Sequence, residues 1–147
     1  MQPMSTTPPG TFDLAAFLPY RLAVAAARVS ARFARQYAAH GVSIPQWRVL
    51  AALGSFGETH ATRLVALTTM DKVKVSRAVA GLTEDGHLRR RPDGEDARRD
   101  LLALTAKGRR LYGTLIPLAL RMQAELLEEL AAEEAVALDA ALTRLGG

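Results

Sequence analysis

Two lysines and an arginine share one short segment, Asp71-Lys72-Val73-Lys74-Val75-Ser76-Arg77. The chain has only three lysines, and two of them fall in the first turn of the helix that Asp71 is expected to cap. A cation there opposes the helix macrodipole at a cost of about 0.3–1 kcal/mol. Because scarce lysines stand where they destabilise the helix, we expect an external anion to bind them. The candidate contacts are Lys72, Lys74, Ser76 and Arg77.

The same segment has a plainer interpretation. Val75, Val79 and Leu82 recur at helical spacing and face the core, which leaves the charges on a solvated outer face, the common case for a surface helix. The neighbouring segments favour DNA binding, because a short helix precedes this one and a hairpin follows it. A helix-turn-helix places its second helix in the major groove, where Lys, Arg and Ser reach phosphates and base edges.

The expected hairpin carries five basic and four acidic residues between Leu88 and Asp100. A mixed-charge loop is by default only solvated. An arginine on a protruding tip nevertheless suits a narrow A·T-rich minor groove, whose negative potential attracts guanidinium. We therefore expect Arg98 and Arg99 to contact DNA. Asp96 is expected to brace the loop, since phosphates would repel its carboxylate.

Helices must position most of these residues, because Ala and Leu make up one third of the 147 residues and aromatic residues only 5%. This composition argues against an all-β fold. Periodicity and caps predict the following elements: a long helix from Phe12 to about His40, bent by Pro19; a helix from Ser43 to the Gly54–Gly57 break; a helix at 60–67 capped by Thr59; a helix from Asp71 to Gly86; strands at 87–92 and 100–104; and helices from Thr105, bent by Pro117, and at 133–145. Three helices followed by a hairpin form a winged helix-turn-helix.

Composition excludes several classes of protein. The chain has no cysteine, which removes disulfides, thiol chemistry and Cys-ligated zinc and fits a reducing compartment. His40, His60 and His87 lie far apart, so we expect no metal site, and no glycine motif for a nucleotide cofactor occurs. No signal peptide or membrane span is expected, and we expect a cytoplasmic protein without a cofactor. The net charge of +4 is unevenly placed, with 12 basic and seven acidic residues between 61 and 110.

The sequence resembles the MarR family of winged-helix transcription regulators. The segments that carry the resemblance are Gln46-Trp47-Arg48-Val49-Leu50, residues 71–79, Gly86-His87-Leu88-Arg89-Arg90, and Asp96-Ala97-Arg98 leading to Leu102-Ala103-Leu104-Thr105. The match runs from about residue 12 to the C-terminus. His60 and Gly81 depart from the family pattern, which usually has Thr or Ser at the former position and a longer residue at the latter. Gly81 costs up to about 1 kcal/mol relative to Ala and suggests a close approach.

The resemblance implies a mainly α fold, with a winged helix-turn-helix at 43–105 and a helical dimerisation region at 12–42 and 106–147, after a disordered tail at 1–11. It further implies a repressor that binds a pseudo-palindromic operator as a homodimer. In this interpretation Lys74, Ser76 and Arg77 match recognition positions, and Arg98 matches the minor-groove arginine. The alternative is a helical protein–protein adaptor that binds no nucleic acid.

The resemblance also implies release by a small effector, often a phenol or an aromatic carboxylate. The candidate effector contacts are Tyr20, Arg21, Arg28 and Trp47. A competing interpretation pairs the arginines of the first helix with acidic residues near the C-terminus, namely Glu125, Glu128, Glu129, Glu133 or Glu134. Trp47 is likewise more often a core residue than a platform for a ligand.

Overall fold

The computed structural model describes residues 9–96 and 98–147. The expected tail at 1–11 therefore lies mostly outside the described residues. The described chain begins with a short 3-10 helix, η1 (Leu14–Ala16), and a long helix, α1 (Leu18–Ala38). The prediction of one helix from Phe12, bent at Pro19, is wrong at its start. Phe17 is extended and Pro19 lies in the first turn of α1, where its missing N–H costs nothing and its ring meets no preceding helical turn.

Helix α2 (Ile44–Phe56) begins and ends where local signals place it. The Ser43 hydroxyl accepts a hydrogen bond from the Gln46 N–H at 3.2 Å, and the Ser43 N–H donates to the Gln46 side chain at 3.0 Å, which completes a capping box. The chain leaves the helix at Gly57, whose φ of +84° favours glycine. The predicted second helix is confirmed.

Thr59 does not cap the next helix, contrary to the prediction. Thr59 and His60 form a short strand, β1 (Thr59–His60), and Thr59 is buried opposite Leu102. Helix α3 (Ala61–Thr68) follows, with His60 at its N-cap and no capping hydrogen bond from that side chain. Thr59 and His60 form a strand because they pair with β3, about forty residues later in the chain. No nearby residue indicates this pairing.

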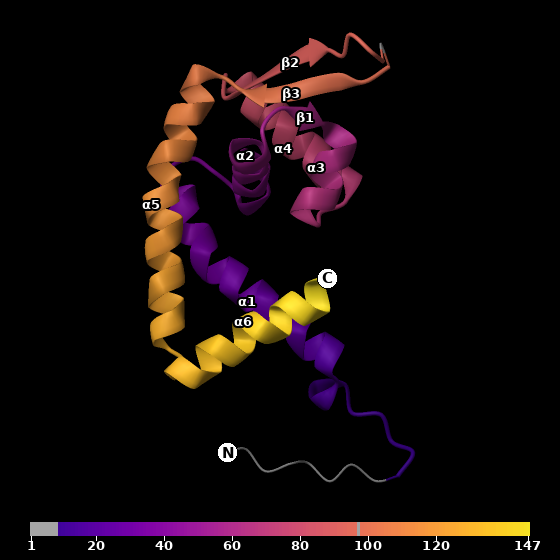
Figure 1. Ribbon diagram of the computed structural model, residues 1–147, viewed down its shortest axis with the longest axis vertical. Coiled ribbons are helices and arrows are strands. Elements are labelled where there is room, and N and C mark those ends of the chain that lie inside the picture. The colour runs from indigo at the N-terminus through magenta and orange to yellow at the C-terminus, as the bar shows by residue number, and fades with distance from the viewer. Residues whose placement is uncertain (1–8, 97) are drawn as a thin grey trace.

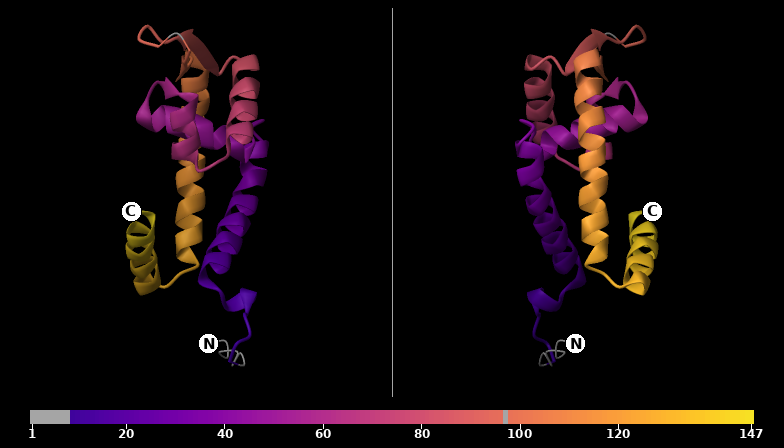
Figure 2. Two further views of the ribbon diagram at one scale, coloured as in Figure 1. Left: turned by 90° about the vertical axis from the view of Figure 1, so that its right-hand side faces the viewer. Right: turned by 90° about the vertical axis from the view of Figure 1, so that its left-hand side faces the viewer.

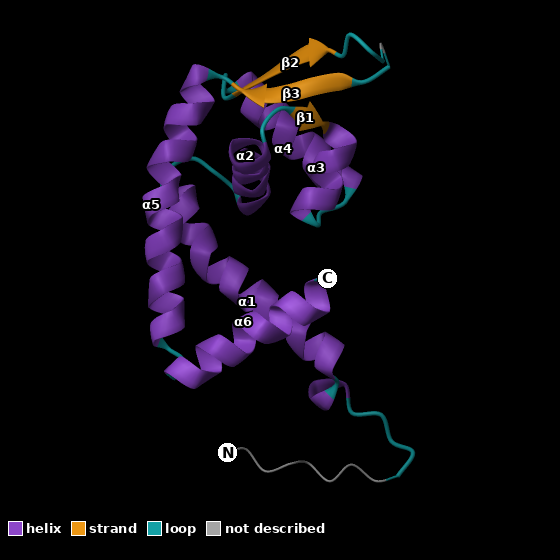
Figure 3. Cartoon of the chain, viewed as in Figure 1, coloured by secondary structure: helices purple, strands orange, loops and turns teal. Residues whose placement is uncertain are grey.

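Helix α4 (Lys72–Glu84) and the hairpin follow the prediction closely. The Asp71 carboxylate accepts from the Lys74 N–H at 2.8 Å, and Val75, Val79 and Leu82 are buried. Strands β2 (Leu88–Pro92) and β3 (Asp100–Leu104) pair antiparallel, and the sheet has the order β1-β3-β2. Figure 3 shows this small sheet capping one end of an otherwise helical molecule.

Helix α5 (Ala106–Glu128) contains Pro117 and runs the length of the molecule, and α6 (Ala132–Gly146) follows after a turn. Figure 1 shows the winged helix at one end of α5 and α6 folding back from the other end. In the side views of Figure 2, α1 and α6 lie on opposite sides of α5. The core joins α2, α3, α4 and the sheet to Tyr37 of α1 and Leu115 of α5, whereas α6 has no buried residue.

Candidate nucleic-acid interface

The outward face of α4 is polar and positively charged. Lys72, Lys74, Ser76 and Arg77 are all exposed, on a helix whose other face is core. Among the described residues, neither lysine nor Arg77 has a carboxylate within 4.0 Å. These cations therefore stand free of internal partners.

The wing is the hairpin of β2 and β3 with its loop, residues 93–99, and Asp96 braces that loop. One oxygen of Asp96 accepts from the Arg98 N–H at 3.0 Å, and its carboxylate lies 3.6 Å from the Nε atoms of Arg98 and Arg99. The Arg98 side chain is 94% exposed. The carboxylate thus points into the loop, as expected, and leaves the Arg98 guanidinium in solvent.

Two of the other three exposed arginines of the wing, Arg90 and Arg91, are paired with carboxylates. Arg91 donates two hydrogen bonds to Glu58, at 2.9 and 2.5 Å, and these hydrogen bonds are the main reason why the pKa of Glu58 lies below its ordinary value. Arg90 lies 3.6 Å from the Asp100 carboxylate.

Arg89 of β2 is also exposed, and no carboxylate of the described residues lies within 4.0 Å of it. Arg98 and Arg99 share the Asp96 carboxylate, and their side chains are 94% and 57% exposed. They are the exposed arginines of the wing loop.

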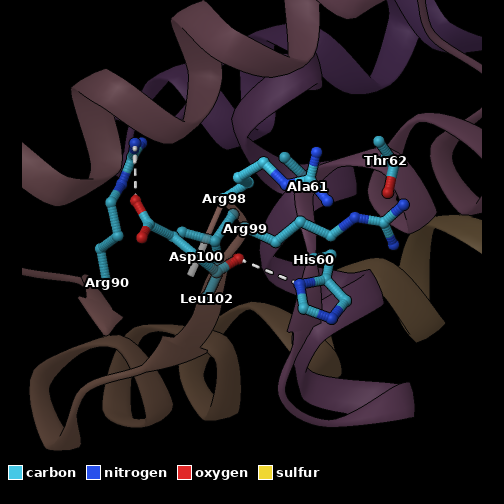
Figure 4. A pocket seen from close by; sticks show the side chains of 8 residues that line it. All are labelled: His60, Ala61, Thr62, Arg90, Arg98, Arg99, Asp100 and Leu102. Atoms are coloured by element: carbon cyan, nitrogen blue, oxygen red, sulfur yellow. Dashed lines mark hydrogen bonds and ion pairs between the residues drawn. The ribbon is translucent and has the colours of Figure 1, made fainter. Parts of the chain in front are cut away.

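A hollow of about 260 Å³ lies between the wing and the start of α3. Figure 4 shows the side chains of Arg98 and Arg99 extending from the wing towards Ala61 and Thr62, and His60 lies below Arg99 in this view. Sequence patterns did not indicate His60 or Thr62 as site residues. The one signal at His60 is its departure from the family pattern.

The first turn of α3 connects the two groups of candidate residues. Ala61 and Thr62 line the hollow under the wing, and they also line a second hollow of about 250 Å³ with Lys72 and Ser76 of α4. The surface is therefore continuous from Arg98 and Arg99 to the start of α4. A single extended anion can contact both groups.

Gly81 lies on α4 beside α2. A β-carbon at this position would stand 2.8 Å from Nε2 of Gln46, the residue that completes the capping box of α2. The close approach that the sequence suggested is therefore present. It brings α4 against the start of α2.

The four candidate effector residues do not come together within one chain. Tyr20, Arg21 and Arg28 lie on the exposed part of α1. Trp47 stacks on Tyr37 at 5.0 Å and on Tyr112 at 6.3 Å between ring centroids. Tyr20 lies 17 residues from Tyr37 along the helix, which is about 25 Å. Trp47 thus joins α1, α2 and α5 as a packing residue.

One arginine of α1 does pair with the acidic C-terminal part of the chain. Arg32 donates to both carboxylate oxygens of Glu129, which lowers the pKa of Glu129 and raises that of Arg32. Both side chains are about half exposed, so this ion pair contributes little stability. Within the described residues Arg21 and Arg28 make no such ion pair.

The described residues contain no cluster of three or more His, Asp or Glu side chains that could hold a metal ion. In that part of the chain no helix combines the length and the apolar character that a bilayer span requires.

Comparisons with known proteins agree with this geometry. A model of the MarR family matches residues 40–99. The transcriptional regulator HosA of Escherichia coli O157:H7 is 29% identical over 90 residues, which cover 61% of this chain and 67% of HosA. A probable transcriptional regulator of Pseudomonas aeruginosa has a structure similar to this one, with a TM-score of 0.79 and 29% identity over 90% of this chain and 99% of that one.

A further similar structure is that of Bordetella bronchiseptica BpsR, whose DNA binding is regulated by 6-hydroxynicotinic acid. Its TM-score is 0.80, with 25% identity over 88% of this chain and 98% of BpsR. The family model covers the helix-turn-helix and most of the wing, and the structural similarity extends over the long helices as well. The chain has a winged helix-turn-helix fold, and it resembles the MarR family of transcriptional regulators in sequence over residues 40–99 and in structure over most of its length.

Proposed function

We propose that this protein is a repressor that binds a pseudo-palindromic operator as a homodimer. The observation that carries the proposal is the continuous surface from the free cations of α4 to Arg98 and Arg99 of the wing. In this proposal Lys72 and Lys74 bind phosphates, Ser76 and Arg77 read base edges in the major groove, and Arg98 and Arg99 reach the minor groove.

The homodimer is supported by apolar side chains that one chain leaves exposed on its long helices. Leu14, Leu18 and Leu22 are 40–56% exposed at the start of the chain, and Leu138, Leu142 and Leu145 are 42–65% exposed on α6. Leu14 lies in η1, but Leu18 and Leu22 lie four residues apart on α1. The three leucines of α6 recur at three- and four-residue steps, so they form a stripe along that helix. A monomer seldom leaves such stripes in water, and a second copy of the chain would bury them. We assign residues 12–42 and 106–147 to this pairing and 43–105 to DNA binding.

The proposed effector is a small aromatic acid. BpsR supports this class, because a hydroxylated pyridine carboxylic acid regulates its DNA binding. Tyr20, Arg21 and Arg28 supply an aromatic ring and two guanidinium groups on α1. Trp47 packs where α1, α2 and α5 meet. The effector site would form only when the helices of two copies pair.

Genomic footprinting of the purified protein tests the proposal. Protected promoter sites with two half-sites about one helical turn apart are the expected result. Adding 6-hydroxynicotinic acid should then release the DNA if this acid resembles the natural effector. A protein that protects no site, and whose weak DNA binding lacks a steep salt dependence, would support the adaptor instead.

A further inference from the structure

His60 contacts both ends of the wing loop. Its Nε2 atom lies 3.2 Å from Oδ2 of Asp93, which follows β2, and its Nδ1 atom lies 3.3 Å from the carbonyl oxygen of Asp100, the first residue of β3. The side chains of His60 and Asp93 are only 25% and 16% exposed. Because His60 is also the N-cap residue of α3, one imidazole joins the helix-turn-helix to both ends of the loop. Figure 4 shows its contact with the Asp100 carbonyl oxygen.

Asp93 links this contact to the arginines of the wing. Its second oxygen, Oδ1, accepts from the Glu95 N–H at 3.0 Å, and its own N–H donates to the Arg99 carbonyl oxygen at 3.1 Å. The position of Asp93 therefore sets the closure of the loop. A shift of Asp93 away from His60 would move Arg98 and Arg99 relative to α3.

Both partners of the imidazole are hydrogen-bond acceptors. A carboxylate and a carbonyl oxygen each require an N–H, and a neutral imidazole carries only one. Only as an imidazolium can His60 therefore form an ion pair with the Asp93 carboxylate and at the same time donate to the Asp100 carbonyl oxygen. The other charged side chains that line the hollow are Arg90, Arg98, Arg99 and the Asp100 carboxylate, and each of these arginines lies within 4.0 Å of an aspartate.

We propose that His60 is a positioning residue for DNA binding, which as an imidazolium holds both ends of the wing loop and so places Arg98 and Arg99 against the DNA. DNA affinity then rises as the pH falls. This inference rests on the proposed function, since it requires the wing to contact DNA.

The test uses the full chain and the duplex that it selects from a random-sequence library. Fluorescence anisotropy at constant ionic strength measures affinity at about pH 6 and about pH 8, which span most of the range in which imidazole groups titrate. We expect about tenfold tighter binding at the lower pH, the effect of one hydrogen bond to a charged group. His60→Ala should lose this difference. The control His40→Ala, at an exposed position beyond the end of α1, should keep it.

Asp93→Asn is an isosteric change that we expect to raise DNA affinity at high pH instead of lowering it. The amide oxygen can still accept from the Glu95 N–H, while the amide N–H₂ can donate to the bare Nε2 of a neutral imidazole. Both ends of the loop are then held without a proton, so affinity at about pH 8 should rise to the unmodified protein's value at about pH 6. This variant keeps the proposal testable if His60→Ala folds poorly.

A double-mutant cycle separates positioning from general destabilisation. In the Arg98→Ala background, His60→Ala should cause much less further loss of affinity, because the two residues act through one contact. Equal losses in both backgrounds, or an unchanged pH dependence in His60→Ala, would overturn the inference alone. A protein that selects no duplex would overturn the proposed function, and the inference with it.

Discussion

Gly108, in the first turn of α5, lies directly against the carbonyl oxygen of His87, where the chain leaves α4 and enters the wing. The same oxygen accepts from the Thr105 N–H at 3.0 Å, and the Thr105 hydroxyl donates to the Gly86 carbonyl at 2.6 Å. These contacts fix the start of α5 against the junction of the recognition helix and the wing. The start of the long helix is thus tied to the end of α4 and the wing by the backbone of residues 86 and 87 and by Thr105.

Gly108→Ala should destabilise the protein by about 3 kcal/mol, because the added methyl group would collide with backbone that cannot move aside cheaply. Urea denaturation measures the loss. Gly113→Ala is the matched control, since it makes the same change in the same helix where nothing lies within 4 Å of the new carbon. It should stabilise the protein by up to about 1 kcal/mol. Equal effects at the two positions would show that the contact with His87 is unimportant.

Arg77→Ala should weaken DNA binding by about 1–3 kcal/mol and relax the preference for one base, if Arg77 reads a base edge as proposed. Competition with single-base variants of the selected duplex measures both effects. Arg121→Ala, which removes an exposed arginine from the far half of α5, should change neither. Unchanged affinity after Arg77→Ala would remove Arg77 from the DNA contacts.

Arg98→Ala should reduce affinity most for duplexes whose flanks are A·T-rich, because a narrow minor groove attracts guanidinium through its negative potential. With G·C-rich flanks the unmodified protein and the variant should bind almost equally. Arg98→Lys should recover only part of the loss, since a lysine is more strongly hydrated than an arginine. Losses that do not depend on the flanking sequence would argue for a phosphate contact instead.

The stability of the fold should fall as the pH drops below about 6.5, in part because of His87. Its Nδ1 atom is buried without a hydrogen-bond partner in the described residues, and burial lowers the pKa of His87, with Lys107 lowering it further. The unfolded chain therefore takes up a proton at a higher pH than the folded chain does. Neutral His87 contributes its full stabilisation at pH values above the pKa of this histidine in the unfolded chain. The contribution is lost as the pH falls below that pKa.

Thermal unfolding of the protein and of His87→Leu between about pH 7.5 and 5.5 measures this contribution. The variant should become more stable relative to the unmodified protein as the pH falls, and this comparison cancels the titration of the other histidines. A constant difference between the two proteins across the range would contradict the prediction.

Leu142→Glu should shift the protein from dimer towards monomer in sedimentation equilibrium, because it places a charge in the apolar stripe of α6 that we assign to pairing. Thr143→Glu is the control, since Thr143 lies beside the stripe and its hydroxyl bonds to the Asp139 carbonyl. A dimer as stable after Leu142→Glu as before would place the pairing surface elsewhere.

The sequence by itself determined the elements whose signals are local. Ser43, Asp71 and Thr105 each cap a helix through an N–H three residues away, and the spacing of Val75, Val79 and Leu82 identified the outward face of α4. Such contacts depend on residues within one turn of each other, so they can be recognised without the fold.

Only the tertiary structure decided the contacts between distant segments. Thr59 became a strand residue because Leu102 pairs with it, and His60 met Asp93 and Asp100 because the sheet closes between residues more than thirty positions apart. Trp47 became a packing residue because α1 and α5 each bring a tyrosine into stacking contact with it. Neither spacing nor propensity carries such information, since these contacts exist only once several elements have packed together.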